Sequence, residues 1–305
     1  MSRIVMVAAA QLGPVQRDDS RADVVERLVT LLRAAAAAGA ELVVFPELAL
    51  TTFFPRWAYA DGDPALDAWY ETDLPNATTS PLWDEAKRLG VGFSIGFAEL
   101  TRDGHRYNTA ILVGPGGSEI GRYRKIHLPG HREPEPWRKF QHLEKRYFEV
   151  GDLGFPVFEA FGGKVGMLIC NDRRWPEAYR VLGLQGVELI CIGYNTPVHN
   201  PPAPEHDQYG DFHNHLVMQA GAYQNGTFVV GVAKAGCEEG VDHIGGSCVI
   251  HPSGTILAEA ATLGDEIVAA TCELDDCTSY KTTVFDLARH REPSQYRALV
   301  EEPPS

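Results

Sequence analysis

The chain has 305 residues, with 27 Lys and Arg against 41 Asp and Glu, so its formal net charge is −14. Hydrophobic residues make up 44% of it and charged residues 22%, which is ordinary for a globular protein with a large core. An acidic chain lacks the net basic surface that nucleic acid requires, so we expect no nucleic-acid partner. The sequence has no apolar run of about 18 residues, so we expect no membrane partner either.

The cysteines point to a reducing compartment. Six are present without a dense disulfide framework, and the apolar N-terminal run ends in a Gln-Leu-Gly-Pro turn with no cleavage site of the secretory type. We therefore expect a cytoplasmic protein with free thiols. Cys272 and Cys277 are spaced C-x4-C, but no second pair accompanies them, so we expect no metal at this pair.

Strand and helix patterns alternate along the first half of the chain. Helical spacing of apolar residues ends before Gly39, where a helix C-terminus favours glycine. A Gly-Pro-Gly-Gly turn joins the last two strands of this half. The pattern predicts strands at 3–11, 41–47, 91–100, 107–114 and 118–126, and helices at 22–38 and 81–89.

The second half repeats this alternation. It predicts strands at 164–170, 187–194, 227–236, 246–254 and 255–260, and helices at 176–185 and 207–223. Strands in both halves with helices between them indicate a layered α/β protein. Residues 127–155 and 194–207 form long loops rich in Pro, His and aromatics, which is typical of functional loops. We expect a single domain over 1–305, with a C-terminal extension from about residue 275.

Three predicted strands end in a residue that could do chemistry, namely Glu47, Lys125 and Cys170. Strand ends are where open α/β proteins build sites, because the rigid sheet fixes what projects from them. A thiol is the strongest nucleophile of the three, a glutamate can take its proton, and a lysine can stabilise an oxyanion.

Taken singly, each of these residues is more often structural, and Cys191 ends a similar apolar run. What favours Cys170 is the Asn-Asp-Arg-Arg-Trp-Pro sequence that follows it. A sharp turn into a helix that begins at Pro176 would leave free backbone N–H groups near the thiol.

Together the segments VVFPELALTTFF, GRYRKIHLPG and GMLICNDRRWPE resemble the Glu-Lys-Cys triad of the nitrilase superfamily of carbon–nitrogen hydrolases. More narrowly, FQHLEKRYFE, CNDRRWPE, GYNTP and HNPP resemble the branch that acts on N-carbamoyl-D-amino acids. Nitrilases proper tend to carry Trp after the cysteine, where this chain has Asn171. The resemblance implies a four-layer αββα sandwich, assembly into homodimers or homotetramers, and neither a metal nor an organic cofactor.

The resemblance also implies roles. Glu47 would be the general base, Lys125 the oxyanion stabiliser and Cys170 the nucleophile, while Glu144 corresponds to a second glutamate near the lysine. The implied reaction releases a D-amino acid, carbon dioxide and ammonia from an N-carbamoyl-D-amino acid. The alternative is another amidase of the superfamily, or a ureidopropionase-type carbamoylase, with a different substrate or handedness.

A small substrate with a free carboxylate needs a local cationic clamp in an acidic chain. Arg173 or Arg174 could supply it in bidentate geometry, and we expect one of the two to pair instead with Asp172 or Glu177. Loops rich in basic residues and histidines could form a pocket for an anion. Amide and hydroxyl side chains could donate hydrogen bonds to a ureido group and accept them from it. The candidate substrate-binding residues are Arg173, Arg174, Asn171, His127, His142, Asn195, Thr196 and His213.

Two other classes of protein remain as rivals. Seven of the eleven histidines lie between His127 and His215, which would suit a zinc amidohydrolase, but the chain has no H-E-x-x-H pattern. A non-catalytic relative is disfavoured because Glu47, Lys125 and Cys170 are all present. If the thiol is the nucleophile, we expect it to have a low pKa and to be inactivated by peroxide.

Overall fold

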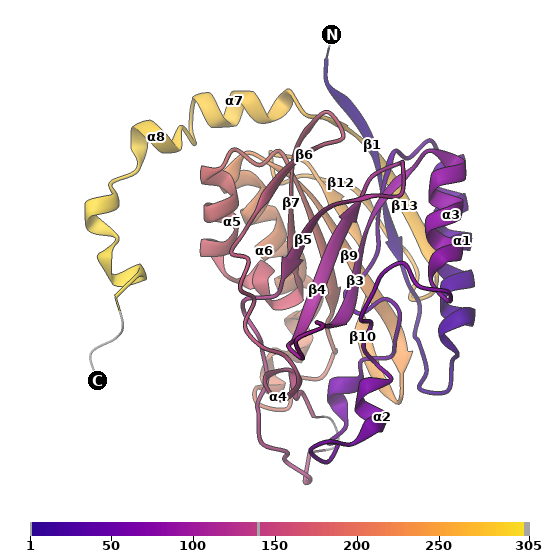
Figure 1. Cartoon of the computed structure of the whole chain (residues 1–305). Coiled ribbons are helices and arrows are strands. Elements are labelled where there is room, and N and C mark those ends of the chain that lie inside the picture. Colours follow the sequence, from indigo (N-terminus) through magenta and orange to yellow (C-terminus); the bar gives the residue numbers. More distant parts are fainter. Residues whose placement is uncertain (1, 139–140, 302–305) are drawn as a thin grey trace.

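The computed structural model describes residues 2–138 and 141–301. Two β-sheets lie face to face and helices cover their outer sides, so the layers run helix, sheet, sheet, helix (Figure 1). The predicted αββα sandwich is therefore confirmed.

The first sheet has six strands in the order β13-β1-β2-β3-β4-β5. Strands β1, β2 and β3 are parallel, and the remaining neighbours are antiparallel. Helices α1 (Arg21–Ala37) and α3 (Ser80–Leu89) pack on its outer face through apolar residues such as Leu28 and Leu82. The strands are β1 (Ile4–Gln11), β2 (Leu42–Val44), β3 (Gly92–Leu100), β4 (Arg106–Val113), β5 (Glu119–Arg124) and β13 (Glu266–Glu273).

The second sheet has seven strands, ordered β12-β11-β9-β8-β7-β6 with β10 paired to β9. Strands β7, β8 and β9 are parallel, and their residues are almost continuously apolar because both faces are covered. Helices α5 (Pro176–Leu184) and α6 (Gly210–Asn225) lie on the outer face. The strands are β6 (Val157–Ala160), β7 (Gly163–Ile169), β8 (Leu189–Asn195), β9 (Phe228–Glu238), β10 (Val241–Ile244), β11 (Cys248–Ile250) and β12 (Ile256–Glu259).

The central core lies between the two sheets. Val44 and Leu112 of the first sheet belong to one buried cluster with Met167 and Ile192 of the second. Because strand side chains alternate between faces, Ala110 and Leu112 of β4 point into this core, whereas Ile111 and Val113 join the outer core under α1 and α3. The packing of the two sheets brings the ends of β2, β5, β7 and β8 together.

Most predicted elements are present with ends shifted by a few residues, but some were missed. Strand β13 runs antiparallel to the whole of β1, although about 260 residues separate them, and most of its side chains are only half-buried. The helix predicted from residue 207 begins as a 3₁₀ turn, Pro204–Tyr209, before α6. The short elements not predicted are β6, β10, α2 (Pro64–Asp67), α4 (Glu144–Tyr147), and the 3₁₀ turns Phe54–Arg56 and Cys170–Arg174.

After β13 the chain leaves the two sheets. It continues through α7 (Asp276–Thr282), α8 (Leu287–His290) and the 3₁₀ turns Pro293–Gln295 and Arg297–Leu299, drawn in yellow as an arm away from the body (Figure 1). Lys281 of α7 donates to the backbone oxygen of Gly186 at 3.1 Å, which ties the start of the arm to the second sheet's outer layer.

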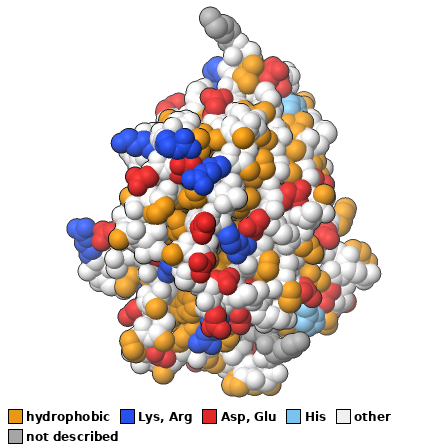
Figure 2. Space-filling model, turned by 90° about the vertical axis from the view of Figure 1, so that its right-hand side faces the viewer, with side chains coloured by type: hydrophobic (Ala, Val, Ile, Leu, Met, Phe, Trp, Pro, Cys, Tyr) orange, Lys and Arg blue, Asp and Glu red, His pale blue; other side chains and the backbone are white. Residues whose placement is uncertain are grey.

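Figure 2 shows the face that carries α1 and α3, where acidic and basic side chains are interspersed among apolar ones. Arg33 of α1 and Arg88 of α3 both bind Glu85, at 2.5 and 2.7 Å, so the pairing links the two helices. In the part of the chain that the structure describes, no helix is both long and apolar enough to cross a bilayer.

Candidate active site

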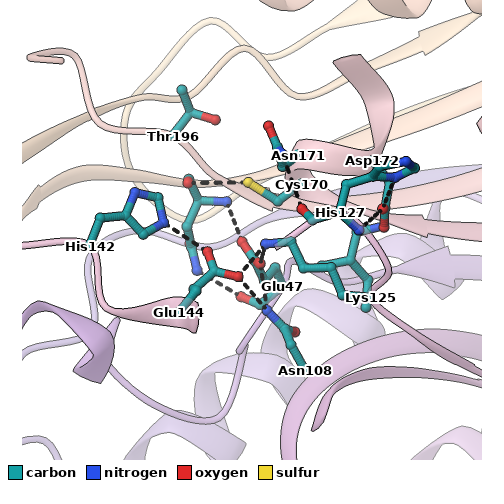
Figure 3. Close-up of polar contacts among 12 residues, drawn as sticks. Glu47, Asn108, Lys125, His127, His142, Glu144, Cys170, Asn171, Asp172 and Thr196 are labelled. Atoms are coloured by element: carbon teal, nitrogen blue, oxygen red, sulfur yellow. Dashed lines mark hydrogen bonds and ion pairs between the residues drawn. The ribbon is translucent and has the colours of Figure 1, made fainter. Parts of the chain in front are cut away.

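The packing of the sheets brings Glu47, Lys125 and Cys170 together (Figure 3). Glu47 follows β2, Lys125 follows β5 and Cys170 follows β7, so each stands just beyond the end of a strand. Lys125 Nζ lies 2.7 Å from Glu47 Oε1 and 2.6 Å from Glu144 Oε2. All three charged side chains are fully buried, so water screens these contacts little.

The turns that carry Glu47 and Cys170 are strained. Leu48 and Cys170 adopt φ values of 46° and 45°, in the left-handed region that residues with a Cβ rarely enter. Glycines let the strands approach the Glu47 turn closely, because a Cβ on Gly96 would lie 2.7 Å from Glu47 Cα and one on Gly193 would strike the Glu47 backbone nitrogen. The strands thus pack directly against the backbone of the Glu47 turn.

Both carboxylate oxygens of Glu47 have donors. Oε1 accepts from Asn108 Nδ2 at 2.8 Å as well as from Lys125, and Oε2 accepts from the backbone N–H of Asn195 at 3.0 Å. The Asn195 side chain donates in turn to the Glu47 carbonyl at 3.1 Å. These bonds fix the orientation of the carboxylate.

Lys125 and Glu144 stabilise each other's charge. Burial would lower the pKa of Lys125, but the carboxylates of Glu144 and Glu47 outweigh it and raise that pKa. Burial would likewise raise the pKa of Glu144, but Lys125 and His142 outweigh it and lower that pKa to about 2. His142 Nε2 lies 2.8 Å from Glu144 Oε1. The lysine and the second glutamate are therefore both charged at neutral pH.

The thiol of Cys170 is buried, with 3% of the residue exposed, and donates to the Asn195 carbonyl at 3.5 Å. Burial and the negative charge of Glu47 raise the pKa of the Cys170 thiol, and the nearby cations Lys125 and Arg173 do not overcome this. The expectation of a low-pKa thiol is therefore wrong for the resting site. A thiol that holds its proton at neutral pH needs a base before it can attack.

Arg173 and Arg174, adjacent in sequence, have different surroundings. Arg173 is buried, and its three nitrogens donate to Asn214 Oδ1, the Cys170 carbonyl and Thr196 Oγ1 at 2.7–3.0 Å. Its guanidinium thereby braces the nucleophile turn. Arg174 is exposed, and Nη1 lies 3.2 Å from Asn171 Oδ1. Among the ion pairs of the described residues none joins either arginine to Asp172 or Glu177, so that expectation is wrong.

A pocket of 560 Å³ opens beside the cluster. Four predicted substrate-binding residues line it, namely His142, Arg174, Thr196 and His213. It also holds Arg138, three further histidines and a single carboxylate, Asp207. Its charged lining is thus two arginines against one aspartate, accompanied by five histidines, in a chain whose net charge is −14.

The remaining candidates lie elsewhere around the nucleophile. His127 is held by Asp172, whose Oδ1 lies 2.8 Å from His127 Nδ1 and accepts the His127 N–H at 2.9 Å. With Asn171 and Trp175 it lines a second pocket of 640 Å³. Asn195 is buried between Glu47 and Cys170, and does not line either pocket.

Sequence reasoning missed two buried polar residues at the site. Asn108 touches both carboxylates, and Asp172 also accepts from the Tyr123 hydroxyl at 2.8 Å and from the Ile169 N–H at 3.0 Å. Asn108 shares a strand face with Ala110 and Leu112, so an amide on an otherwise apolar face was the available signal.

Over residues 2–138 and 141–301, no three His, Cys, Asp or Glu side chains gather closely enough to hold a metal ion. Cys272 and Cys277 are both buried and free.

The fold and the site define a class, a four-layer αββα protein with a buried Cys-Glu-Lys cluster at its strand ends. The family model for carbon-nitrogen hydrolases matches residues 6–282, and the chain belongs to this family. A crystal structure of a carbon-nitrogen hydrolase from Helicobacter pylori G27 has the same fold, with a TM-score of 0.84 over 99% of both chains at 22% identity.

The similar proteins indicate the type of reaction but do not identify the substrate. A nitrilase of Pyrococcus abyssi is 33% identical over 274 residues, covering 89% of this chain and 90% of its own. An N-carbamoylputrescine amidase of Solanum lycopersicum is 29% identical over 310 residues, covering 98% and 96%. The chain is thus a carbon–nitrogen hydrolase of the amidase type, and these relatives are named for substrates other than N-carbamoyl-D-amino acids.

Proposed function

We propose that the protein hydrolyses N-carbamoyl amino acids, of the D-series, to the amino acid, carbon dioxide and ammonia. The observation that carries this proposal is Arg174 in the pocket beside the Cys170 turn, without a carboxylate partner among the described residues, because a ureido substrate of this kind ends in a carboxylate. The D-hand rests on the resemblance of CNDRRWPE, GYNTP and HNPP alone.

The charges of the pocket favour an anionic substrate end. Arg174 has no carboxylate partner among the described residues, whereas Arg138 pairs with Glu135. Asp207 is already engaged, since it binds His199 Nδ1 at 2.6 Å and accepts the Asn200 N–H at 2.8 Å. An exposed guanidinium beside the nucleophile turn can bind a carboxylate through two parallel hydrogen bonds.

The cluster supports a covalent mechanism. Glu47 takes the proton of Cys170 and the thiolate attacks the ureido carbon, while Lys125 and the backbone N–H of Asn171 stabilise the oxyanion. The protonated Glu47 returns its proton to whichever ureido nitrogen departs, which leaves the carbonyl carbon bound to Cys170 as a thioester. Water activated by Glu47 then cleaves the thioester and regenerates the thiol. The released carbamate loses carbon dioxide and frees the second nitrogen, so that the products are the amino acid, carbon dioxide and ammonia in either order. Asn195 links the Cys170 thiol to the Glu47 carboxylate, because its backbone carbonyl accepts from the thiol and its backbone N–H donates to Glu47.

A second candidate is a carbamoylated amine with a cationic end, as in the name of the Solanum lycopersicum relative, which spans nearly the whole chain. It would require Asp207 to exchange His199 for the substrate ammonium. The two candidates therefore differ in which pocket residue meets the distal charge, Arg174 or Asp207.

The test is ammonia release from N-carbamoyl-D-phenylalanine, N-carbamoyl-L-phenylalanine and N-carbamoylputrescine, with Cys170→Ala as the control. We expect turnover of the D-form that Cys170→Ala abolishes while the fold stays intact. Turnover of the L-form alone would refute the proposed preference for the D-series. Turnover of N-carbamoylputrescine alone would refute the proposal that the substrate carries a carboxylate. Near-normal activity of Cys170→Ala would refute the mechanism.

We also propose a homo-oligomer, dimer or tetramer, in the cytoplasm. Large apolar side chains on α5 and α6 are exposed, including Leu184, Phe212 and Leu216, which is typical of a face that another chain covers. All six cysteines are free, as expected of a reducing compartment. Light scattering after gel filtration would measure the mass, and a monomer would contradict the assembly.

A further inference from the structure

Asn108 occupies the centre of the charged cluster, although neither the resemblance nor the proposed mechanism assigns it a role. It lies on β4, is fully buried, and faces the second sheet (Figure 3). Its Nδ2 donates to Glu47 Oε1 at 2.8 Å and lies 3.5 Å from Glu144 Oε2. Its backbone carbonyl accepts the Lys125 N–H at 2.8 Å. One residue thus contacts both carboxylates and the backbone of Lys125.

The orientation of the Asn108 amide follows from its neighbours. Ionised carboxylates only accept hydrogen bonds, so the NH₂ group must face Glu47 and Glu144 and the oxygen must point away. That oxygen is buried and finds no hydrogen-bond partner among the described residues. A buried polar atom without a partner destabilises a fold, and such atoms in native proteins often accompany a functional arrangement.

We infer that Asn108 is a positioning residue that holds the Glu47 carboxylate in place as the acceptor of the thiol proton. This inference rests on the proposed function, in which Glu47 is the base. Two carboxylates share one ammonium in this buried site, so their charges are not fully balanced. The partial positive charge of the amide hydrogens lies between the two carboxylates and offsets their repulsion.

The test uses the alkylation rate of Cys170 by iodoacetamide as a function of pH, which requires no knowledge of the substrate. Mass spectrometry assigns the adduct to Cys170 among the six cysteines. A carboxylate that loses a hydrogen-bond donor binds a proton more readily. We therefore expect Asn108→Ala to move the acidic limb of the rate profile up by about one pH unit, a tenfold change in proton affinity.

Asn108→Asp has nearly the same size and serves if the alanine variant does not fold. It replaces the donor with a third carboxyl group, so the acidic limb should move further up than in Asn108→Ala. Thr109→Val is the matched control, because Thr109 is the next residue of β4, equally buried, and its hydroxyl binds Glu99 at 2.7 Å on the opposite face. This control should lose thermal stability without moving the limb.

The outcomes separate this inference from the proposed function. If Glu47→Gln leaves the wild-type profile unchanged, Glu47 is not the base and the mechanism itself fails. If Glu47→Gln removes the acidic limb but the folded Asn108 variants keep the wild-type limb, only the role of Asn108 is overturned. A shift of equal size in Thr109→Val would reduce Asn108 to a structural residue and overturn the inference as well.

Discussion

Glu144→Gln should reveal how strongly the buried charges depend on one another. Lys125 is fully buried and its ammonium contacts two carboxylates, at 2.7 and 2.6 Å. The substitution keeps the size of the side chain but removes one of these charges. It also removes the charge that faces His142 Nε2 at 2.8 Å.

The magnitude follows from the burial of the pair. Removal of one partner from a buried ion pair costs about 3–5 kcal/mol, and we expect the lower end because Glu47 still neutralises Lys125. For a chain of this size each kcal/mol lowers the melting temperature by about 2 °C, so the variant should melt roughly 6 °C lower at neutral pH. Asp73→Asn is a suitable control, since its pair with Arg102 is exposed and is expected to contribute about 1 kcal/mol or less.

The pH dependence of this difference gives the decisive measurement. The folded pKa of Glu144 is lowered from 4.5 to about 2, so its ionic contribution is fully present above pH 4.5 and is lost as the pH falls towards 2. Urea unfolding of wild type and variant at pH 7, 5, 4 and 3 should therefore show a free-energy gap that narrows below pH 4.5. A gap that stays constant with pH, or that is no larger than that of Asp73→Asn, would refute the reasoning.

Three further changes should have specific effects. Arg174→Lys should raise KM for a carboxylate substrate about tenfold with little change in kcat, because a single ammonium cannot reproduce a bidentate pair; an unchanged KM in steady-state kinetics would contradict the clamp. Gly193→Ala should abolish activity and lower the melting temperature, since its Cβ would strike the Glu47 backbone, and wild-type values of both would contradict that clash. Peroxide should inactivate the enzyme through Cys170 only slowly, because the buried thiol keeps its proton, and dithiothreitol should restore only the early sulfenic stage; rapid inactivation with Cys170 oxidised first among the six cysteines, shown by mass spectrometry, would contradict this.

The parts of the fold that depend on local patterns could be predicted from the sequence. Continuous apolar runs predict the parallel strands β2, β7 and β8, and the strand ends point to Glu47 and Cys170. Strand β13 was not predicted, because its half-buried side chains show no clear hydrophobic periodicity. Its place beside β1 depends on a pairing across about 260 residues that no local pattern reveals.

The difference between Arg173 and Arg174 could not be predicted because it depends on a turn. Cys170–Arg174 is a 3₁₀ helix, with three residues per turn, so adjacent side chains point about 120° apart. One arginine consequently points inward to the Cys170 carbonyl and the other outward to the pocket. From the sequence alone the two arginines are equally good candidates for binding a carboxylate. Their burial distinguishes them, because buried Arg173 stabilises the Cys170 turn and exposed Arg174 lines the pocket.

The raised pKa of the Cys170 thiol follows first from its burial and then from the negative charge of Glu47 beside it. A resting thiolate would place a further negative charge beside Glu47 in a site that water does not screen, and the cations Lys125 and Arg173 do not offset the cost of burying it. Transfer of the thiol proton to Glu47 avoids this, because the negative charge moves from oxygen to sulfur and the total does not change. The thiolate can therefore form only as Glu47 is protonated, at the moment when a carbonyl carbon is present to accept the sulfur. We conclude that the buried cluster suppresses unproductive thiolate, and that its reactivity depends on the base rather than on an acidic thiol.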